Sequence, residues 1–334
     1  MDSPIRALKQ ISKSLTGRTI RSVPLLRKAF GNSLKVFLYH DVTDTPSRFA
    51  EEFGLAVSTE LFSRQISWID RNFEIIHPRA LLGKAPLPDN AALITFDDGF
   101  HGTLANGLQL LERRRIPSVV FLNMQAIIEH RPILSAVACY RERNLPRFAE
   151  YAKAAGISRP LHLSGTPEIM RRLEQHFGPV DRVAVGGYQG QFADLALVNR
   201  FADSELAVYG NHLYEHWNAA ALTPAEFIEQ YALNQKALAQ FRNSAEIFAF
   251  PNGLPNTCYT NVHIELLTGL GAKRVFAAVG GINREPNNYV LGRMSVNARD
   301  NDEDILWCRL LRAAISGRPK LKQRTVDCRT APHT

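Results

Sequence analysis

The chain has 334 residues, of which 45% are hydrophobic and 22% charged, and its formal net charge is +8. This length suffices for one large domain with a substantial core, or for two small ones. No apolar run approaches the ~20 residues of a membrane-spanning helix.

The basic residues are concentrated at the two ends of the chain. Residues 1–40 carry a net charge of +7 and residues 317–334 carry +4, which leaves −3 for the rest. Apolar residues at helical spacing in the first segment suit a helix that lies on a membrane or packs on the domain. The ends are either solvated tails or surfaces for an anionic lipid or polyanion, and we expect no nucleic acid partner.

Strand-like apolar runs alternate with helix-like segments along the chain. We predict strands at residues 36–38, 91–96, 118–122, 206–209, 247–250, 275–279 and 289–296, and helices at 59–72, 104–115 and 223–241. Such β-α alternation predicts a parallel sheet or a barrel. We divide the chain into a basic N-terminal segment (1–33), a domain (34–316) and a basic C-terminal tail (317–334).

The alternation is lost between about residues 126 and 190. This stretch is rich in helix-forming residues and has few strand-like runs, so we predict a mostly helical insertion between two barrel elements. Further β-α units are the less favoured alternative.

Polar residues follow the predicted strands repeatedly. His40 follows the first strand, Asp97 and Asp98 follow the strand at 91–96, His212 follows the strand at 206–209, and Pro251-Asn252 follow the strand at 247–250. In a β-α barrel the C-terminal strand ends converge on one face, where catalytic residues collect. We therefore expect these groups to meet in space.

Two adjacent carboxylates at the end of a buried strand repel each other and are costly to desolvate. His212 and His216 are spaced i, i+4, so they share a helix or turn face and can reach one ion. Alone this pair is a weak signal, but together with one aspartate it forms a His₂-carboxylate catalytic metal site. The second aspartate can then take a proton from water whose pKa the metal lowers to ~7.

Four motifs in order resemble those of the polysaccharide deacetylase family, also called the NodB-homology or carbohydrate esterase family 4 group. They are Thr95-Phe96-Asp97-Asp98-Gly99, His212-x-x-x-His216, Phe250-Pro251-Asn252-Gly253 and Leu291-Gly292-Arg293-Met294-Ser295-Val296. Leu38-Tyr39-His40-Asp41-Val42 is similar to the first strand of the exopolysaccharide-deacetylase branch. The resemblance runs from about residue 34 to residue 300, interrupted by the insertion.

The resemblance implies an α/β fold, a distorted (β/α) barrel of the NodB-homology type with a mostly helical insertion. It implies metal-dependent hydrolysis of an N-acyl group, typically N-acetyl, on an amino sugar of a polysaccharide or of its lipid- or nucleotide-linked precursor. The roles that it implies are general base for Asp97 and ligands of one divalent ion for Asp98, His212 and His216. The ion is expected to be zinc, with cobalt or nickel as alternatives.

The substrate-binding residues are predicted around the third motif. Backbone N–H groups near Asn252 would stabilise the oxyanion, and we place Pro251 and Asn252 at the substrate. Trp217 is a candidate for stacking on a sugar ring, with a core aromatic as the alternative.

The sequence departs from the family pattern at three points. Ala249 stands where many members have the arginine that orients the base. Leu213 replaces the usual Ser or Thr after the first metal histidine. No Leu-His pair follows Val296 to supply the general acid, and we propose His40 as its substitute, with a structural histidine as the alternative.

A haloacid-dehalogenase-type phosphatase needs aspartates two positions apart, and residue 96 is Phe, so we set it aside. A catalytically impaired, carbohydrate-binding relative is the remaining alternative.

The predicted location is the cytoplasm, with peripheral contact at the inner membrane face and a lipid-linked substrate. The start of the chain lacks the apolar core of a secretory signal, and four scattered cysteines suit a reducing compartment.

Overall fold

The computed structural model describes residues 16, 18–19, 30–83, 85–280 and 282–315. Most of the basic N-terminal segment and the C-terminal tail lie outside the described residues, and so does the amphipathic helix predicted near the start. Within the described part of the chain, no helix combines the length and apolar character needed to cross a bilayer.

A parallel sheet that closes on itself forms the centre of the molecule. Its strands are paired in parallel in the order β1 (Leu34–Tyr39), β5 (Ala91–Phe96), β6 (Ser118–Leu122), β7 (Ala207–Asn211), β8 (Ser244–Ala249), β9 (Arg274–Ala277) and β11 (Val290–Gly292). One residue after β11, β12 (Met294–Ser295) pairs in parallel with β1. This last segment joins the two ends of the sheet, so the predicted distorted barrel is confirmed.

Short strands complete the sheet. β4 (Glu74–Ile75) pairs with β5, and β10 (Ile282–Asn283) pairs antiparallel with β1. Away from the barrel, β2 (Asp41–Val42) pairs with β3 (Ala56–Val57).

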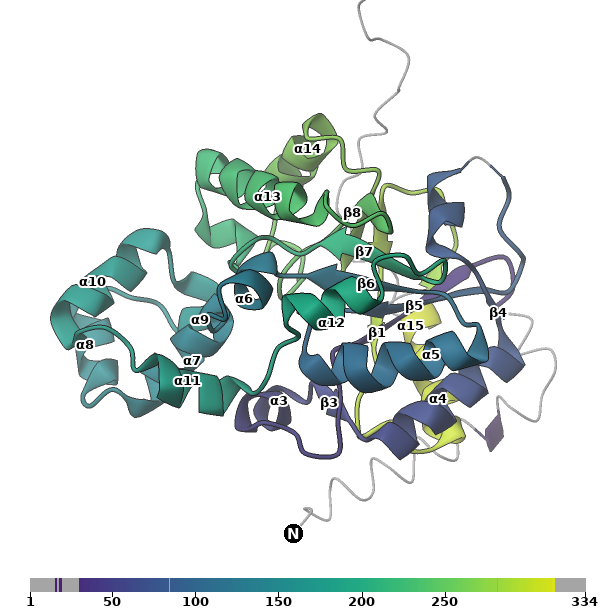
Figure 1. Cartoon of the computed structure of the whole chain (residues 1–334), viewed down its shortest axis with the longest axis horizontal. Helices are drawn as coiled ribbons and strands as arrows, with labels where there is room; N and C mark the ends of the chain where they lie inside the picture. The colour runs from purple at the N-terminus through teal and green to yellow at the C-terminus, as the bar shows by residue number, and fades with distance from the viewer. Residues whose placement is uncertain (1–15, 17, 20–29, 84, 281, 316–334) are drawn as a thin grey trace, which may run out of the picture.

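Helices cover the outside of the barrel (Figure 1). They are α4 (Thr59–Asn72), α5 (Gln109–Arg114), α13 (Pro224–Leu238), α14 (Asn261–Gly269) and α15 (Glu303–Ile315). The side chain of Ser58 accepts from Leu61 N at the start of α4, and Thr223 and Glu226 form a reciprocal capping box at the start of α13. These caps satisfy the first N–H groups of each helix and set where it begins.

The strands are buried on both faces, which explains their continuous apolar sequences. One set of side chains packs in a cluster that draws on all seven parallel strands from β1 to β11, as expected for a barrel interior. It includes Val36, Leu93, Val119, Val208, Ile247, Phe276 and Leu291. Alternate residues such as Ile94 and Val120 belong to a second cluster that includes the helices outside.

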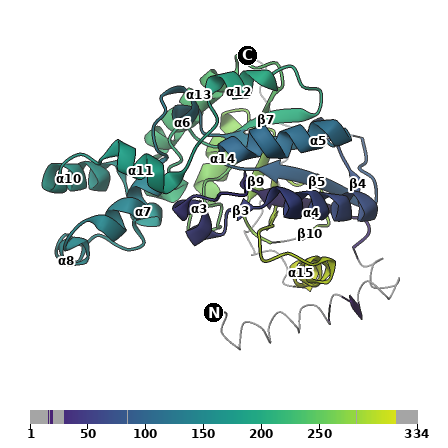
Figure 2. The ribbon, with the colours of Figure 1, turned by 60° about the horizontal axis from the view of Figure 1, so that its bottom comes forward.

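The chain between β6 and β7 is helical. It forms α6 (Met124–Ile128), α7 (Leu134–Asn144), α8 (Phe148–Ala154), α9 (Leu161–Ser164), α10 (Pro167–Phe177), α11 (Arg182–Gln189) and α12 (Leu195–Arg200). Helices α7 to α11 extend to one side of the barrel next to α3 (Arg48–Phe53), as both ribbon views show (Figure 1, Figure 2). This helical insertion has a small core of its own, which includes Phe148, Leu161 and Leu173.

The predicted elements match the observed ones to within a few residues, with two differences. The helix predicted at 104–115 begins with a π-helical turn over Thr103–Leu108 before α5. The single strand predicted at 289–296 is interrupted at Arg293, whose backbone N–H donates to Ala277 O at 3.1 Å.

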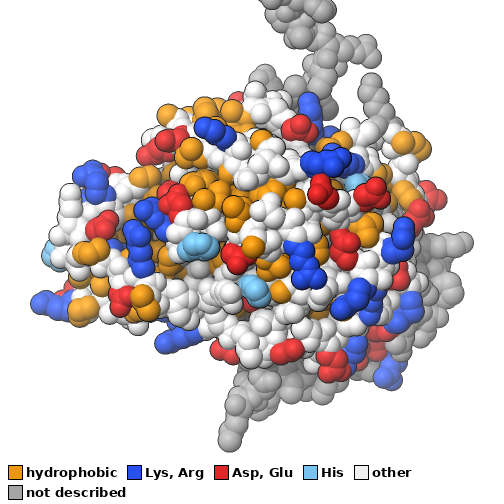
Figure 3. Space-filling view, viewed as in Figure 1, with side chains coloured by type: hydrophobic (Ala, Val, Ile, Leu, Met, Phe, Trp, Pro, Cys, Tyr) orange, Lys and Arg blue, Asp and Glu red, His pale blue; other side chains and the backbone are white. Residues whose placement is uncertain are grey.

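The surface facing the viewer in Figure 1 carries basic and acidic side chains interspersed with one another, and apolar side chains gather near its middle (Figure 3). The apolar side chains exposed on the covering helices include Ile128 of α6 and Leu233 of α13.

Candidate active site

Asp97 and Asp98 follow β5 in a tight turn. Asp98 has φ 73° and Gly99 has φ 90°, a left-handed conformation that glycine adopts readily and aspartate tolerates. A Cβ on Gly99 would lie 2.9 Å from Leu122 Cδ2. The turn lets two neighbouring carboxylates, both 3% exposed, contact different partners.

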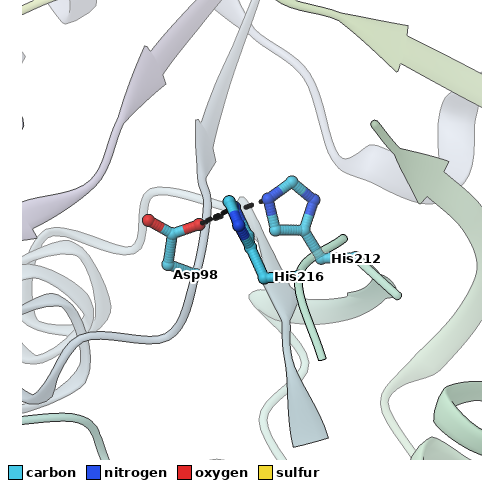
Figure 4. A group of neighbouring side chains, drawn as sticks. All are labelled: Asp98, His212 and His216. Atoms are coloured by element: carbon cyan, nitrogen blue, oxygen red, sulfur yellow. Dashed lines mark ion pairs between the residues drawn. The ribbon is translucent and has the colours of Figure 1, made fainter. Parts of the chain in front are cut away.

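The carboxylate of Asp98 lies beside both predicted metal histidines (Figure 4). Its Oδ1 is 3.3 Å from His212 Nε2 and 3.1 Å from His216 Nε2. Ligand atoms of the three residues all lie within 4.8 Å of one another, and all three residues are buried.

Hydrogen bonds to the far ring nitrogens orient both imidazoles. His212 Nδ1 is 2.8 Å from Ala249 O, and His216 Nδ1 is 2.7 Å from Ser135 Oγ of α7. A carbonyl can only accept, so His212 donates from Nδ1, and Nε2 is the ring nitrogen that faces Asp98 and that can bind a metal ion when it carries no proton. Such partners are the usual support of metal-bound histidines.

The donor set fits a divalent transition metal. Two imidazole nitrogens and one carboxylate oxygen on one side of a pocket leave positions open for water and substrate, the arrangement of catalytic zinc sites. Burial would raise the pKa of Asp98, but His216 and His212 hold it well below its usual value. An ionised Asp98 is the form that binds a cation.

His212 and His216 lie in a loop after β7 and not on a helix. Leu213 and His216 both have φ 60°. Asn123 Nδ2 donates to Leu213 O at 2.9 Å, and Glu215 accepts from Trp217 Nε1 and Gln125 Nε2, both at 2.7 Å. The sequence predicted that the two histidines share a face of either a helix or a turn, and the structure places them on a turn.

Asp97 forms a buried bidentate ion pair with Arg293. Its Oδ1 is 2.6 Å from Arg293 Nη1 and its Oδ2 is 2.7 Å from Nη2, and Arg293 is fully buried. Burial would raise the pKa of Asp97, but Arg293 and then His212 hold it below its usual value. Asp97 is thus ionised and fixed in direction.

Arg293 and Ser135 both contact predicted site residues, and the sequence assigned no role to either of them. We looked for the base-orienting arginine at position 249, where Ala249 stands, and did not assign the arginine within the last motif. The signal was present, because Arg293 interrupts the apolar run of a predicted buried strand, where a charge needs a partner.

A pocket of 190 Å³ opens onto this cluster. It is lined by His40, Asp97, Asp98, His212, His216 and Asn252, together with Ser295 and residues outside the barrel. His40 follows β1, which pairs with β12, so it lies beside the last strand as expected. Burial lowers the pKa of His40, against the opposing effect of Asp98 and Asp97.

Two predicted substrate residues do not line the pocket. Trp217 is 6% exposed, packs in an apolar cluster with Leu213 and Phe227, and donates to Glu215. Trp217 therefore lies where the core alternative places it, enclosed in that cluster and apart from the residues that line the pocket. Pro251 is buried at the start of the turn whose next residue, Asn252, reaches the pocket.

Comparisons with known proteins agree with this fold. A model of the polysaccharide deacetylase family matches residues 84–275, more than half of the chain. The chain therefore belongs to the polysaccharide deacetylase family, whose members are carbohydrate deacetylases, a class of hydrolases. No match was found among curated protein sequences.

Solved structures of similar fold include IcaB from Ammonifex degensii, with a TM-score of 0.56, 19% identity and coverage of 84% of this chain and 98% of that one. A de-N-acetylase from Aggregatibacter actinomycetemcomitans has a TM-score of 0.53 and 16% identity, and the match covers 83% of this chain and 99% of that one. The Streptococcus pyogenes deacetylase PplD has a TM-score of 0.51 and 13% identity, and the match covers 80% of this chain and 96% of that one.

We predict that Arg293→Met lowers the free energy of unfolding by about 3–5 kcal/mol, because it leaves Asp97 buried without its partner. The double variant with Asp97→Asn should be less destabilised than the sum of the single changes, since the orphaned charge is removed. Urea unfolding measures all three variants.

Arg242→Met is the control, because Arg242 pairs with Asp203 at the surface, where both side chains are at least 80% exposed. It should change stability by less than about 1 kcal/mol. Additive losses from Arg293→Met and Asp97→Asn would show that the two side chains are not coupled.

Proposed function

We propose that the protein is a metal-dependent N-deacetylase that removes an acyl group, acetyl in the simplest case, from an amino sugar. The observation that carries this proposal is the cluster of Asp98, His212 and His216 in the same small pocket as an ionised Asp97. Zinc suits the donor set, and cobalt or nickel would fit it as well.

The chain's own groups would divide the reaction among them. A bound divalent ion supplies positive charge that polarises the amide carbonyl and lowers the pKa of water. Asp98, His212 and His216 would hold that ion. Asp97, ionised beside Arg293, accepts a proton from the attacking water, and N–H groups at Asn252 stabilise the oxygen of the tetrahedral intermediate.

The leaving amine needs a proton before it departs, and His40 in its protonated form is the proposed donor. Burial lowers the pKa of His40 and disfavours that form, whereas the neighbouring Asp98 and Asp97 favour it. His40 lies on the same pocket as Asp97, at the place where β1 meets β12. Three other histidines line the pocket. His212 and His216 belong to the proposed metal cluster, and His162 lies on α9 and not at the end of a barrel strand.

The catalytically impaired alternative is not favoured. Its support was the missing arginine at position 249 together with the unclear general acid. Arg293 makes the contact with the base that the absent arginine would make.

We predict that Asp97→Asn keeps about one metal ion per chain but lowers turnover on an N-acetylated amino sugar by about 10²–10⁴-fold, the range for loss of a general base. His212→Ala should lose the metal. Elemental analysis and acetate release measure the two effects. Equal metal loss in Asp97→Asn and His212→Ala would mean that Asp97 is a ligand and not the base.

His40→Ala should depress hydrolysis of an amide far more than hydrolysis of an activated ester at the same site, because an activated alcohol leaves without a proton. The ratio of the two rates in wild type and variant is the measurement. A variant that loses both activities equally would assign His40 a structural role.

The substrate that we propose is a lipid-linked precursor at the inner membrane face. The support is the charge distribution, with +7 in residues 1–40 and +4 in residues 317–334 of a chain whose remainder is −3. Basic residues near an anionic bilayer each contribute about 1 kcal/mol to binding.

We predict that the full chain co-sediments with anionic but not neutral liposomes, and that salt releases it because the Debye length falls from ~10 Å at 0.1 M to ~3 Å at 1 M. Replacing Lys9, Lys13 and Lys28 by Gln should weaken binding. The same change at Lys153, Lys236 and Lys273, which are exposed on the body, should not. Equal losses of liposome binding in the two triple lysine variants, or no binding of the full chain at low salt, would favour a soluble sugar substrate.

A further inference from the structure

One wall of the metal pocket comes from outside the barrel. Phe49 and Phe53 belong to α3, Ser135 and Cys139 to α7, and His162 to α9. Of these, Ser135 is accounted for, because it orients His216. The remaining four side chains take no part in the chemistry proposed above.

This wall is held together by contacts between α3 and the helical insertion. Glu52 of α3 accepts from Tyr188 OH of α11 at 2.6 Å and pairs with Arg143 of α7. Ser47 Oγ donates to Gln189 O at 2.7 Å. Both ribbon views place α3 against α7 and α11 (Figure 1, Figure 2). The wall is therefore a fixed surface.

Phe53 is the exposed member of this wall. It is 41% exposed, whereas Phe49 beside it is 4% exposed. The ring of His162 packs edge to face on Phe53, with 5.5 Å between the ring centroids and 79° between the ring planes. The ring of Phe49 also packs on Phe53, with 5.1 Å between the centroids and 49° between the planes. These contacts fix the direction of the Phe53 ring and leave part of it open at the pocket. An open aromatic face suits the C–H face of a sugar ring.

Asn252 contributes an unused donor to the same pocket. Its Nδ2 is buried and has no hydrogen-bond partner among the described residues. The turn that carries it is rigid, since Asn252 has φ 59° and a Cβ on Gly253 would lie 2.6 Å from Ala278 N. A buried amide without a partner is costly, so a ligand oxygen at this point would be well bound.

The pocket is small. Its 190 Å³ is below the roughly 300–1,000 Å³ of pockets that enclose a drug-sized ligand. It has room for one sugar ring beside the metal site, and the wall of α3 and the helical insertion limits extension on that side.

We propose that α3 and the helical insertion build a sugar-binding subsite over the metal site, which takes one terminal amino sugar. Phe53 stacks on one face of the ring, and the side-chain amide of Asn252 donates to one of the sugar's oxygen atoms. This inference rests on the proposed deacetylase function, because it specifies how the same pocket selects its substrate.

The test uses the full-length, zinc-loaded protein and the methyl glycosides of N-acetylglucosamine, N-acetylgalactosamine and N-acetylmannosamine. For the best of the three, Phe53→Ala should raise KM by about 2- to 12-fold, the range for loss of one aromatic contact, with a smaller change in kcat. Phe53→Tyr should keep the wild-type KM. Val262→Ala, which is 51% exposed on α14, is the control and should have no effect.

Asn252→Ala should raise KM in the same assay, and circular dichroism of each variant checks that it is folded. Wild-type protein should also prefer the single sugar to internal residues of its hexamer. An unchanged KM in Phe53→Ala, or equal rates on internal residues of the hexamer, would overturn the subsite while leaving the deacetylase function intact.

Calorimetric binding of the same glycosides to Asp97→Asn protein separates the two proposals. Binding that Phe53→Ala weakens, with no turnover by wild type, supports the subsite and rejects the deacetylase function. Absence of binding by all three glycosides overturns the subsite whatever the turnover.

Discussion

The site depends on how the protein tolerates two adjacent negative charges at the end of a buried strand. The charge of Asp97 is offset by the guanidinium of Arg293, in a geometry with two parallel hydrogen bonds. The charge of Asp98 faces two imidazoles and is available to a cation. A buried charge pair is stable only when its geometry and hydrogen bonds are good. The left-handed backbone at Asp98 allows both charges to be buried, because it points the two carboxylates in different directions.

Much of the fold could be predicted because its signals are local. The helix at 59–72 has a serine cap and an apolar face, and the strand at 118–122 is a β-branched run, so both were predicted with their observed bounds. The interruption at Arg293 was not predicted, because it depends on Ala277 of a different strand. The same holds for the enclosure of Trp217, whose neighbours lie on other elements of the chain.

For the site as well, features that follow from nearby sequence could be predicted, and contacts between residues far apart in the sequence could not. The order of the motifs was enough to bring Asp98, His212 and His216 together, since they follow strands of one parallel barrel. Ser135, which orients His216, lies in an insertion that we had treated only as an addition between two strands. The helical insertion is therefore part of the site, and removing it would leave His216 without its hydrogen-bond partner Ser135.

The closure of the barrel by its last strands also has a consequence for how the chain matures during translation. Arg293 is 196 residues from Asp97 in the sequence, so a ribosome that adds about 5–20 residues per second makes it about 10 to 40 seconds later. Until then the nascent chain holds two neighbouring carboxylates without the guanidinium, and β1 lacks its partner β12. The carboxylate of Asp97 acquires its fixed orientation only as the barrel closes. The ion pair between Asp97 and Arg293 therefore forms only when the ring of strands is complete.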